Sequence, residues 1–176
     1  MCKRIYITGI AATGKTTLTK EFLRRGIFAF AIDELPGLGA WVNRNTKQKV
    51  DISFYQANRA WLEAHAWTCE VSKLKSLLAT DTDLIIATGI FANHDELLGL
   101  FDRVFLLQCA PAVFLQRIEK RNREAPGNFG WHREQRELLL AVYQDLENQL
   151  IAQGAVPIDA SQSTEKVAEA ILSALS

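Results

Sequence analysis

Short apolar runs recur along the chain at intervals that leave room for a helix between them. Such runs are typical of buried strands, and strands that alternate with helices form right-handed crossover units. The pattern therefore predicts an α/β fold, with a parallel sheet covered by helices on both faces. The five predicted strands are Arg4–Thr8, Ile27–Ile32, Asp83–Thr88, Arg103–Gln108 and Ala155–Ile158. Because nothing resembling a linker interrupts residues 1–176, a single domain is expected.

Amphipathic periodicity marks the helices between these strands. The longest stripe runs from Ser53 to Ala79, where apolar residues spaced by three, four and seven predict one helix with Trp61 facing the core. On its opposite side Arg59 and Glu63 stand at i, i+4 spacing, so Arg59 either reaches a ligand or pairs with Glu63. Comparable signals predict helices from Thr17 to Arg25, from near Pro111, and from His132 to Gln153.

A segment rich in turn-forming residues separates the last two of these helices. Residues 122–131, from Asn122 to Trp131, contain Pro126, Gly127 and Gly130, which interrupt both periodic patterns. We expect this segment to form a short mobile lid over a ligand.

Composition and charge restrict the partners. Lys and Arg number 20, Asp and Glu also number 20, and 48% of the 176 residues are hydrophobic. The balance predicts no basic surface for nucleic acid or an anionic membrane, and no apolar run has the length of a membrane span. The chain enters its first strand too early for a signal peptide. We expect a cytoplasmic monomer or homodimer that binds a small molecule.

The cysteines and histidines show no pattern of a disulfide framework or a zinc site. Cys2, Cys69 and Cys109 are odd in number and lack C-x-x-C spacing, and the three histidines form no H-x-x-x-H pair. We expect the cysteines to be buried thiols.

The strongest chemical signal follows the first predicted strand. Residues 9–16 read Gly-Ile-Ala-Ala-Thr-Gly-Lys-Thr, the G-x-x-x-x-G-K-[ST] pattern of a phosphate-binding loop. Backbone N–H groups of such a loop surround phosphates, Lys15 reaches the terminal phosphates, and the Thr16 hydroxyl can ligate Mg²⁺. The next helix points its positive N-terminal end at the same anion. The predicted nucleotide-binding residues here are Gly9, Ala11, Ala12, Thr13, Gly14, Lys15, Thr16 and Thr17.

Two carboxylates follow the second predicted strand. Asp33 and Glu34 fall at the carboxyl edge of the sheet, where open α/β folds bind ligands. Phosphoryl transfer to a hydroxyl requires a group that accepts the hydroxyl proton, and a carboxylate fits that role. We assign the base, metal and substrate contacts to Asp33 and a substrate contact to Glu34, and the sequence leaves open whether the two exchange roles.

Basic residues cluster near the end of the helix that begins at Pro111. Arg117 and Arg121 share one helix face, and Arg123 follows. Arginines in this place can stabilise charge that develops on a transferred phosphoryl group, whereas the alternative is a solvated face neutralised by neighbouring glutamates. We predict Lys15, Asp33 and Arg121 as the catalytic residues.

These motifs together resemble the P-loop small-molecule kinases, a superfamily of adenylate-kinase-like, shikimate-kinase-like and nucleoside-kinase-like enzymes. The resemblance covers nearly the whole chain and rests on residues 9–16, on Asp33, on Arg117-x-x-x-Arg121 before a short lid, and on Ile158-Asp159-Ala160-Ser161 before the last helix. It implies a three-layer P-loop NTPase fold and ATP with Mg²⁺ as cofactors. It also implies nucleotide contacts from Arg117, Ala160 and Ser161, phosphate contacts from Arg121, and an acceptor region over residues 33–80.

The chain departs from this pattern at the third predicted strand. That strand ends in Thr88-Gly89, without the Asp-Gly of many nucleotide kinases or the acidic residue of a Walker B strand. The departure argues against a nucleoside monophosphate acceptor and leaves the metal to Thr16 and Asp33. The Thr88-Gly89 turn resembles that of shikimate-type kinases, which implies a substrate contact at Gly89, but the basic residues of a shikimate site are not recognisable.

The predicted function is ATP-dependent phosphoryl transfer to a hydroxyl or phosphate of a small metabolite. A nucleoside-like acceptor is one candidate, because Trp41, Trp61 and Trp67 fall in the acceptor region, although core packing explains Trp61 equally well. An ATPase and a nucleotide sensor remain alternatives. The spacing argues against an ATPase, because residues 28–34 lie closer to the phosphate-binding loop than the corresponding strand of motor enzymes. A GTPase is also not indicated, because the sequence has no N-K-x-D or D-x-x-G motif.

Overall fold

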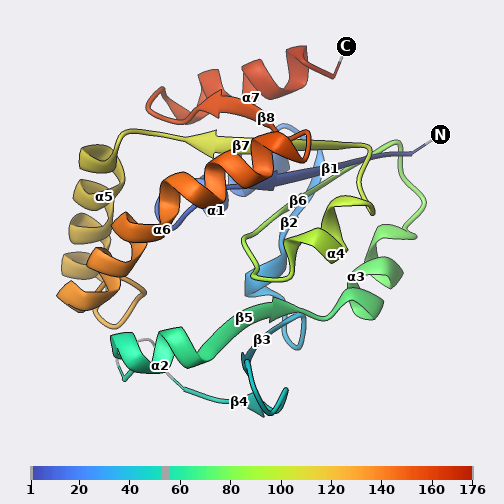
Figure 1. Cartoon of the computed structure of the whole chain (residues 1–176). Helices are drawn as coiled ribbons and strands as arrows, with labels where there is room; N and C mark the ends of the chain where they lie inside the picture. Colours follow the sequence, from blue (N-terminus) through green and yellow to red (C-terminus); the bar gives the residue numbers. More distant parts are fainter. Residues whose placement is uncertain (1, 53–55, 176) are drawn as a thin grey trace.

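A parallel sheet of five strands forms the centre of the computed structural model, which describes residues 2–52 and 56–175 (Figure 1). The strand order is β2-β6-β1-β7-β8, and every neighbouring pair is parallel. The strands are β1 Lys3–Thr8, β2 Phe28–Ala31, β6 Leu84–Thr88, β7 Arg103–Gln108 and β8 Val156–Asp159. The predicted α/β fold and its five strands are therefore confirmed, with ends that differ by one residue in all but β7.

Alternate residues of the strands build the two apolar layers. Ile5 and Ile7 of β1 face α1 (Lys15–Arg24) and α7 (Thr164–Ser173), whereas Tyr6 between them faces α3 (Val71–Leu78) and α4 (His94–Leu98). The long helix α6 (Arg133–Ala152) packs on the sheet through β7. This period of two produces the predicted three-layer arrangement.

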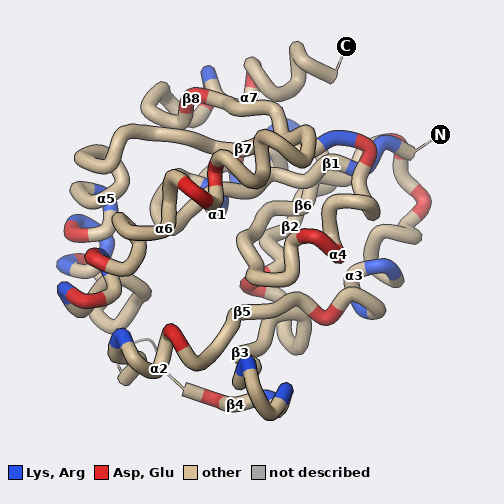
Figure 2. The backbone as a smooth tube through the Cα atoms, viewed as in Figure 1, with Lys and Arg blue, Asp and Glu red and all other residues tan. Residues whose placement is uncertain are grey.

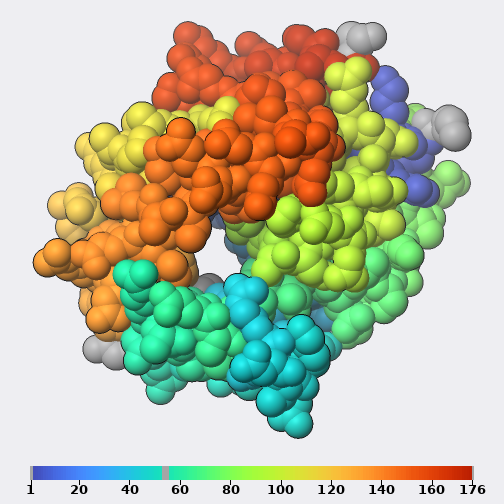
Figure 3. All heavy atoms as spheres, in the orientation of Figure 1, coloured from blue at the N-terminus to red at the C-terminus, as the bar shows by residue number. Residues whose placement is uncertain are grey.

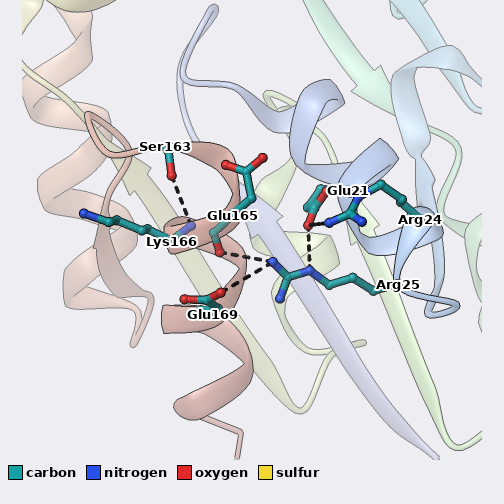
Figure 4. Close-up of polar contacts among 7 residues, drawn as sticks. All are labelled: Glu21, Arg24, Arg25, Ser163, Glu165, Lys166 and Glu169. Atoms are coloured by element: carbon teal, nitrogen blue, oxygen red, sulfur yellow. Dashed lines mark hydrogen bonds and ion pairs between the residues drawn. The ribbon is translucent and has the colours of Figure 1, made fainter.

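Charged contacts join α1 to α7 (Figure 4). Glu21, which is only 7% exposed, accepts hydrogen bonds from Arg24 and from Arg25, the residue directly after α1, each at 2.7 Å, and these bonds lower the pKa of Glu21 to about 2. Arg25 in turn donates to the main-chain oxygen of Glu165 in α7 at 3.3 Å. The helix that follows the phosphate-binding loop is thus fixed to the C-terminal helix.

A second, antiparallel sheet was not predicted. It contains β3 (Gly39–Asn43), β4 (Lys49–Val50) and β5 (His65–Cys69) in the order β4-β3-β5. The single helix predicted from Ser53 to Ala79 is therefore wrong: residues 53–55 lie outside the described residues, and the remainder forms α2 (Arg59–Ala64), β5 and α3. The helical pattern of apolar residues has a gap of seven positions between Ala64 and Val71. In that gap the chain forms β5 and pairs with β3, where Trp67 lies opposite Trp41.

The irregular segment that the sequence predicts as a lid begins later than expected. Helix α5 (Pro111–Glu124) includes residues 122–124, so the irregular part is residues 125–132, called loop 125–132 below. The second half of α5, from Arg117 to Glu124, carries basic and acidic residues interleaved (Figure 2). After β2 the chain forms one 3-10 turn, Ile32–Glu34, which places Asp33 and Glu34 at the carboxyl edge of the sheet.

Three further findings bear on the expected chemistry. No helix within the described part of the chain combines the length and apolarity needed to cross a membrane. The three cysteines are free thiols, but only Cys69 is buried, whereas Cys2 and Cys109 are partly exposed. The described residues contain no group of three or more His, Cys, Asp or Glu side chains arranged to hold a metal ion.

Candidate active site

The phosphate-binding loop, residues 9–16, connects β1 to α1 in a conformation that depends on its glycines. Gly9 has φ 150°, and a Cβ there would lie 2.7 Å from the main-chain oxygen of Leu107. Gly14, directly before α1, has φ 103°. Inside the loop the Thr13 hydroxyl donates to the main-chain oxygen of Ile10 at 2.9 Å. A compact loop is therefore held at the N-terminal end of α1, where helix N–H groups favour an anion.

Lys15 is buried within this loop. Its Nζ donates to the main-chain oxygens of Gly9 at 2.5 Å and Ile10 at 2.8 Å. Burial lowers the pKa of Lys15 to about 8, while the charge of Asp33 raises that pKa and the charge of Arg121 lowers it. The three residues that the sequence predicts as catalytic are thus close enough to interact electrostatically.

A large cleft opens beside the loop and extends toward β3 and β5. Its volume is about 1430 Å³. Figure 3 shows the hollow between α6 and the antiparallel sheet. The predicted site residues that line it are Ala11, Ala12, Thr13, Gly14, Lys15, Thr16, Thr17, Asp33, Glu34, Arg117, Arg121 and Ala160. One cavity therefore gathers residues from the loop, the end of β2, α5 and the segment after β8.

Four predicted site residues are not among the described residues that line the cleft: Gly9, Arg59, Gly89 and Ser161. Arg59 forms an ion pair with Glu63 at 2.8 Å, the second of the two alternatives left open by the sequence. Gly89 donates its N–H to the oxygen of Ile7 and accepts from the Tyr6 hydroxyl, so both its main-chain groups are used internally. The Ser161 hydroxyl donates to Asp159 at 2.6 Å.

The two arginines of α5 occupy different parts of the cleft. Arg117 donates to the main-chain oxygen of Ala160 at 2.9 Å and to that of Thr13 at 3.5 Å, so it connects the segment after β8 with the phosphate-binding loop. Arg121 donates through Nη2 to the oxygen of Phe129 at 2.6 Å. Its Nε is buried and has no hydrogen-bond partner among the described residues, and burial lowers the pKa of the group.

A buried cation with an unused donor fits a negatively charged ligand. Leaving such a donor unpaired costs free energy that an anion in the cleft would recover. The left-handed glycines of the loop, the amine of Lys15 and the free Nε of Arg121 therefore form a donor set suited to phosphate oxygens.

Aromatic side chains form the far wall of the cleft, next to β3 and β5. The Trp41 ring lies 5.0 Å from Trp61 and 5.5 Å from Trp67, and the His65 ring stacks on Trp61 at 4.1 Å. Trp41, Trp67 and His65 line the cleft, together with Phe91.

His65 is fixed through both ring nitrogens. Nδ1 donates to the oxygen of Trp61 at 2.7 Å, and Nε2 accepts from the amide of Asn43 at 3.3 Å. His65 was not predicted, because its position depends on the pairing of β5 with β3. Only the neighbouring β3–β4 hairpin has a signal in the sequence: Asn43 and the polar residues after it lie between Trp41-Val42 and Val50.

Comparison with family models gives one match, to the AAA domain, over residues 5–139. No curated protein sequence matches the chain.

Solved structures of several small-molecule kinases share the fold. Shikimate kinase from Acinetobacter baumannii in complex with shikimate superposes with a TM-score of 0.62 at 20% identity, covering 99% of this chain and 93% of that one. Deoxyadenosine kinase from M. mycoides with bound dATP superposes with a TM-score of 0.59 at 19% identity, covering 98% of each chain. A gluconokinase from Sinorhizobium meliloti 1021 superposes with a TM-score of 0.54 at 12% identity, covering 95% of this chain and 87% of that one.

The structural matches confirm, at the level of the fold, the resemblance to P-loop small-molecule kinases. The family model covers most of the chain, from β1 into α6. The chain belongs to the AAA domain family and has the fold of the P-loop small-molecule kinases.

Proposed function

We propose that the chain transfers the terminal phosphoryl group of ATP to a hydroxyl or phosphate group of a small metabolite. The observation that carries this proposal is the convergence of Lys15, Asp33 and Arg121 on one cleft, where the charges of Asp33 and Arg121 act on the buried Lys15 amine. A passive nucleotide site has no need of a carboxylate in the cleft beside its lysine, whereas transfer to a hydroxyl requires one.

The residues of the nucleotide half bind and orient the donor. Main-chain N–H groups of residues 11–17 surround the phosphates, and Lys15 supplies positive charge to them. Arg117, which donates to the main-chain oxygen of Ala160, is assigned together with Ala160 to the adenine, as the resemblance to the superfamily implies. Arg121 stabilises charge that develops on the transferred group. Thr16 and Asp33 would hold Mg²⁺, which when bound neutralises phosphate charge and orients the terminal phosphate.

Asp33 stands on the acceptor side of the cleft. For a hydroxyl acceptor, the Asp33 carboxylate takes the proton while the acceptor oxygen bonds to the terminal phosphorus, the bond from that phosphorus to its bridging oxygen breaks, and ADP leaves. Glu34, next to it and also lining the cleft, contacts the same acceptor. The wall of Trp41, Trp67 and Phe91 offers flat apolar surfaces, which suit a nucleoside-like acceptor.

ATP hydrolysis without an acceptor is the second candidate, favoured by the match to the AAA domain. ADP release from Mg·ATP, measured alone and with pools of nucleosides, nucleotides, sugars and hydroxy acids, separates the two. A kinase releases ADP slowly alone and much faster with one pool. Equal, rapid release in every pool identifies an ATPase, and tight ATP binding without ADP release in any pool identifies a sensor.

A further inference from the structure

One buried side chain connects loop 125–132 to the segment that leads into α2. Gln135, near the start of α6, has no exposed surface. Its Oε1 accepts from the N–H of Gly130 at 2.7 Å, and its Nε2 donates to the main-chain oxygen of Ala57 at 2.7 Å. Gly130 belongs to loop 125–132, and Ala57, also fully buried, precedes α2. The two amide ends of Gln135 therefore hold two segments that are far apart in the sequence.

A second hydrogen bond strengthens the same junction. The N–H of Arg59, the first residue of α2, donates to the carboxylate of Glu134 at 3.1 Å. The first turns of α2 and α6 are thus joined, and Figures 1 and 3 show α2 against the α6 end that adjoins the loop.

Each connected segment leads to a different half of the cleft. On the loop side, Phe129 lines the cleft and accepts the hydrogen bond from Arg121. On the α2 side, Leu62 and His65 line the acceptor half, and His65 stacks on Trp61. A continuous path of contacts runs from Arg121 through Phe129, Gly130 and Gln135 to α2.

The free energy lost when these hydrogen bonds break means that movement of one segment is transmitted to the other. An amide buried as deeply as that of Gln135 loses free energy when either of its hydrogen bonds is broken, because no water replaces the partner. A shift of loop 125–132 toward bound phosphates therefore either draws the segment before α2 along or breaks one of these two hydrogen bonds of Gln135.

We propose that Gln135 is a positioning residue that couples movement of loop 125–132 on the nucleotide to movement of α2 on the acceptor. Both halves of the cleft then close together, which brings Asp33 and the acceptor to the phosphates only when the nucleotide is bound. The proposal rests on the proposed function, because it takes the ligand of the loop to be ATP.

Hydrogen exchange tests the coupling without knowledge of the acceptor. The probe is a non-hydrolysable ATP analogue with Mg²⁺, and the readout is amide protection in residues 9–16, 125–132 and 59–65. In the wild type we expect the analogue to slow exchange in all three segments, by about tenfold in residues 59–65. Gln135→Met, which keeps the length of the side chain but removes both hydrogen bonds, should retain the protection of residues 9–16 and lose that of residues 59–65. The control Gln144→Met, at an exposed position on the same helix, should behave as the wild type.

The outcomes separate this inference from the proposed function. Protection of residues 9–16 without any protection of residues 59–65 in the wild type overturns the coupling alone, whether or not Gln135→Met folds. Equal protection of residues 59–65 in the wild type and a folded Gln135→Met also overturns it. A role of Gln135 in stability alone would speed exchange in residues 59–65 equally with and without the analogue. If the analogue protects no residue in 9–16, the proposed function fails, and the inference fails with it.

Discussion

At the scale of single residues, Lys15 has a charge that depends strongly on its surroundings. Burial lowers the pKa of Lys15 to about 8, so in the protein without nucleotide the Lys15 amine begins to lose its proton just above neutral pH. Phosphate groups in the loop favour the charged amine and raise this pKa, so binding above pH 8 is accompanied by proton uptake. Calorimetry of a non-hydrolysable ATP analogue at about pH 8.5, in buffers of different ionisation enthalpy, measures that uptake. We expect the wild type to take up as much as one proton for each analogue molecule bound and Lys15→Ala to take up none. Binding without proton uptake by the wild type would contradict the assignment of Lys15 to the phosphates.

Asp33 and Glu34 differ in their predicted contribution to turnover. Asp33→Asn preserves the shape of the side chain but removes the proton acceptor, so we expect acceptor phosphorylation to fall by about 10²–10⁴ with little change in ATP affinity. Glu34→Gln is the matched control, and it should affect the acceptor KM more than kcat. If Glu34→Gln loses activity and Asp33→Asn keeps it, the two assigned roles must be exchanged.

The two arginines of α5 should separate binding from turnover. Arg121→Ala removes the buried cation with the unused Nε, and we expect turnover to fall by about 10²–10³ with a smaller change in ATP affinity. Arg117→Ala removes the contacts to Thr13 and Ala160, and it should weaken ATP binding by about tenfold. Arg123→Ala, at an exposed position in the last turn of α5, serves as the control. The same kinetic change in all three variants would argue for a general effect of charge.

At the scale of elements, loop 125–132 contains two glycines that should respond differently to the same change. Gly127 and Gly130 both have positive φ, of 92° and 85°. A Cβ at Gly130 would lie 2.6 Å from Cγ2 of Ile118, whereas no described atom outside the neighbouring residues lies within 4 Å of one at Gly127. Gly130→Ala should therefore lower the free energy of unfolding by about 1–3 kcal/mol more than Gly127→Ala. Urea denaturation measures the free energy of unfolding of both variants. Equal decreases would show that the loop shifts to accommodate the added Cβ next to Ile118.

The elements also show which parts of the fold can be predicted from sequence. Strands β1, β6 and β7 are buried on both faces, so each appears as a continuous apolar run. The antiparallel sheet has no such local signal, because β5 becomes a strand only by pairing with β3, more than twenty residues earlier in the chain. Periodicity on either side of β5 was therefore extended through it as one helix.

The same distinction applies to the site. The phosphate-binding loop is a local motif, since its glycines and Lys15 lie within seven residues, so the sequence alone indicates where it lies. The wall formed by Trp41, His65 and Trp67 depends on register between β3 and β5, which spacing along one segment does not reveal. Gly89 was predicted from a resemblance in sequence, but its main-chain groups are bonded to Ile7 and Tyr6.

At the scale of the whole molecule, one cleft connects two structural units of different kinds. The parallel sheet supplies the phosphate-binding loop and Asp33, while the antiparallel sheet supplies the aromatic wall. Shikimate kinase, deoxyadenosine kinase and gluconokinase share the fold with this chain, although their names indicate different substrates. Because a shared fold does not define the acceptor, we propose that the aromatic wall and Glu34 select it.

In the proposed reaction, the terminal phosphoryl group of ATP is transferred to an organic acceptor in this cleft. Its most direct test follows that group by mass spectrometry after incubation of Mg·ATP with pooled nucleosides, nucleotides, sugars and hydroxy acids, for the wild type and for folded Lys15→Ala and Asp33→Asn. We predict one phosphorylated acceptor with the wild type, and a yield lower by at least about 10² with each variant. Release of inorganic phosphate alone in every pool, or undiminished product with both variants, would contradict the claim.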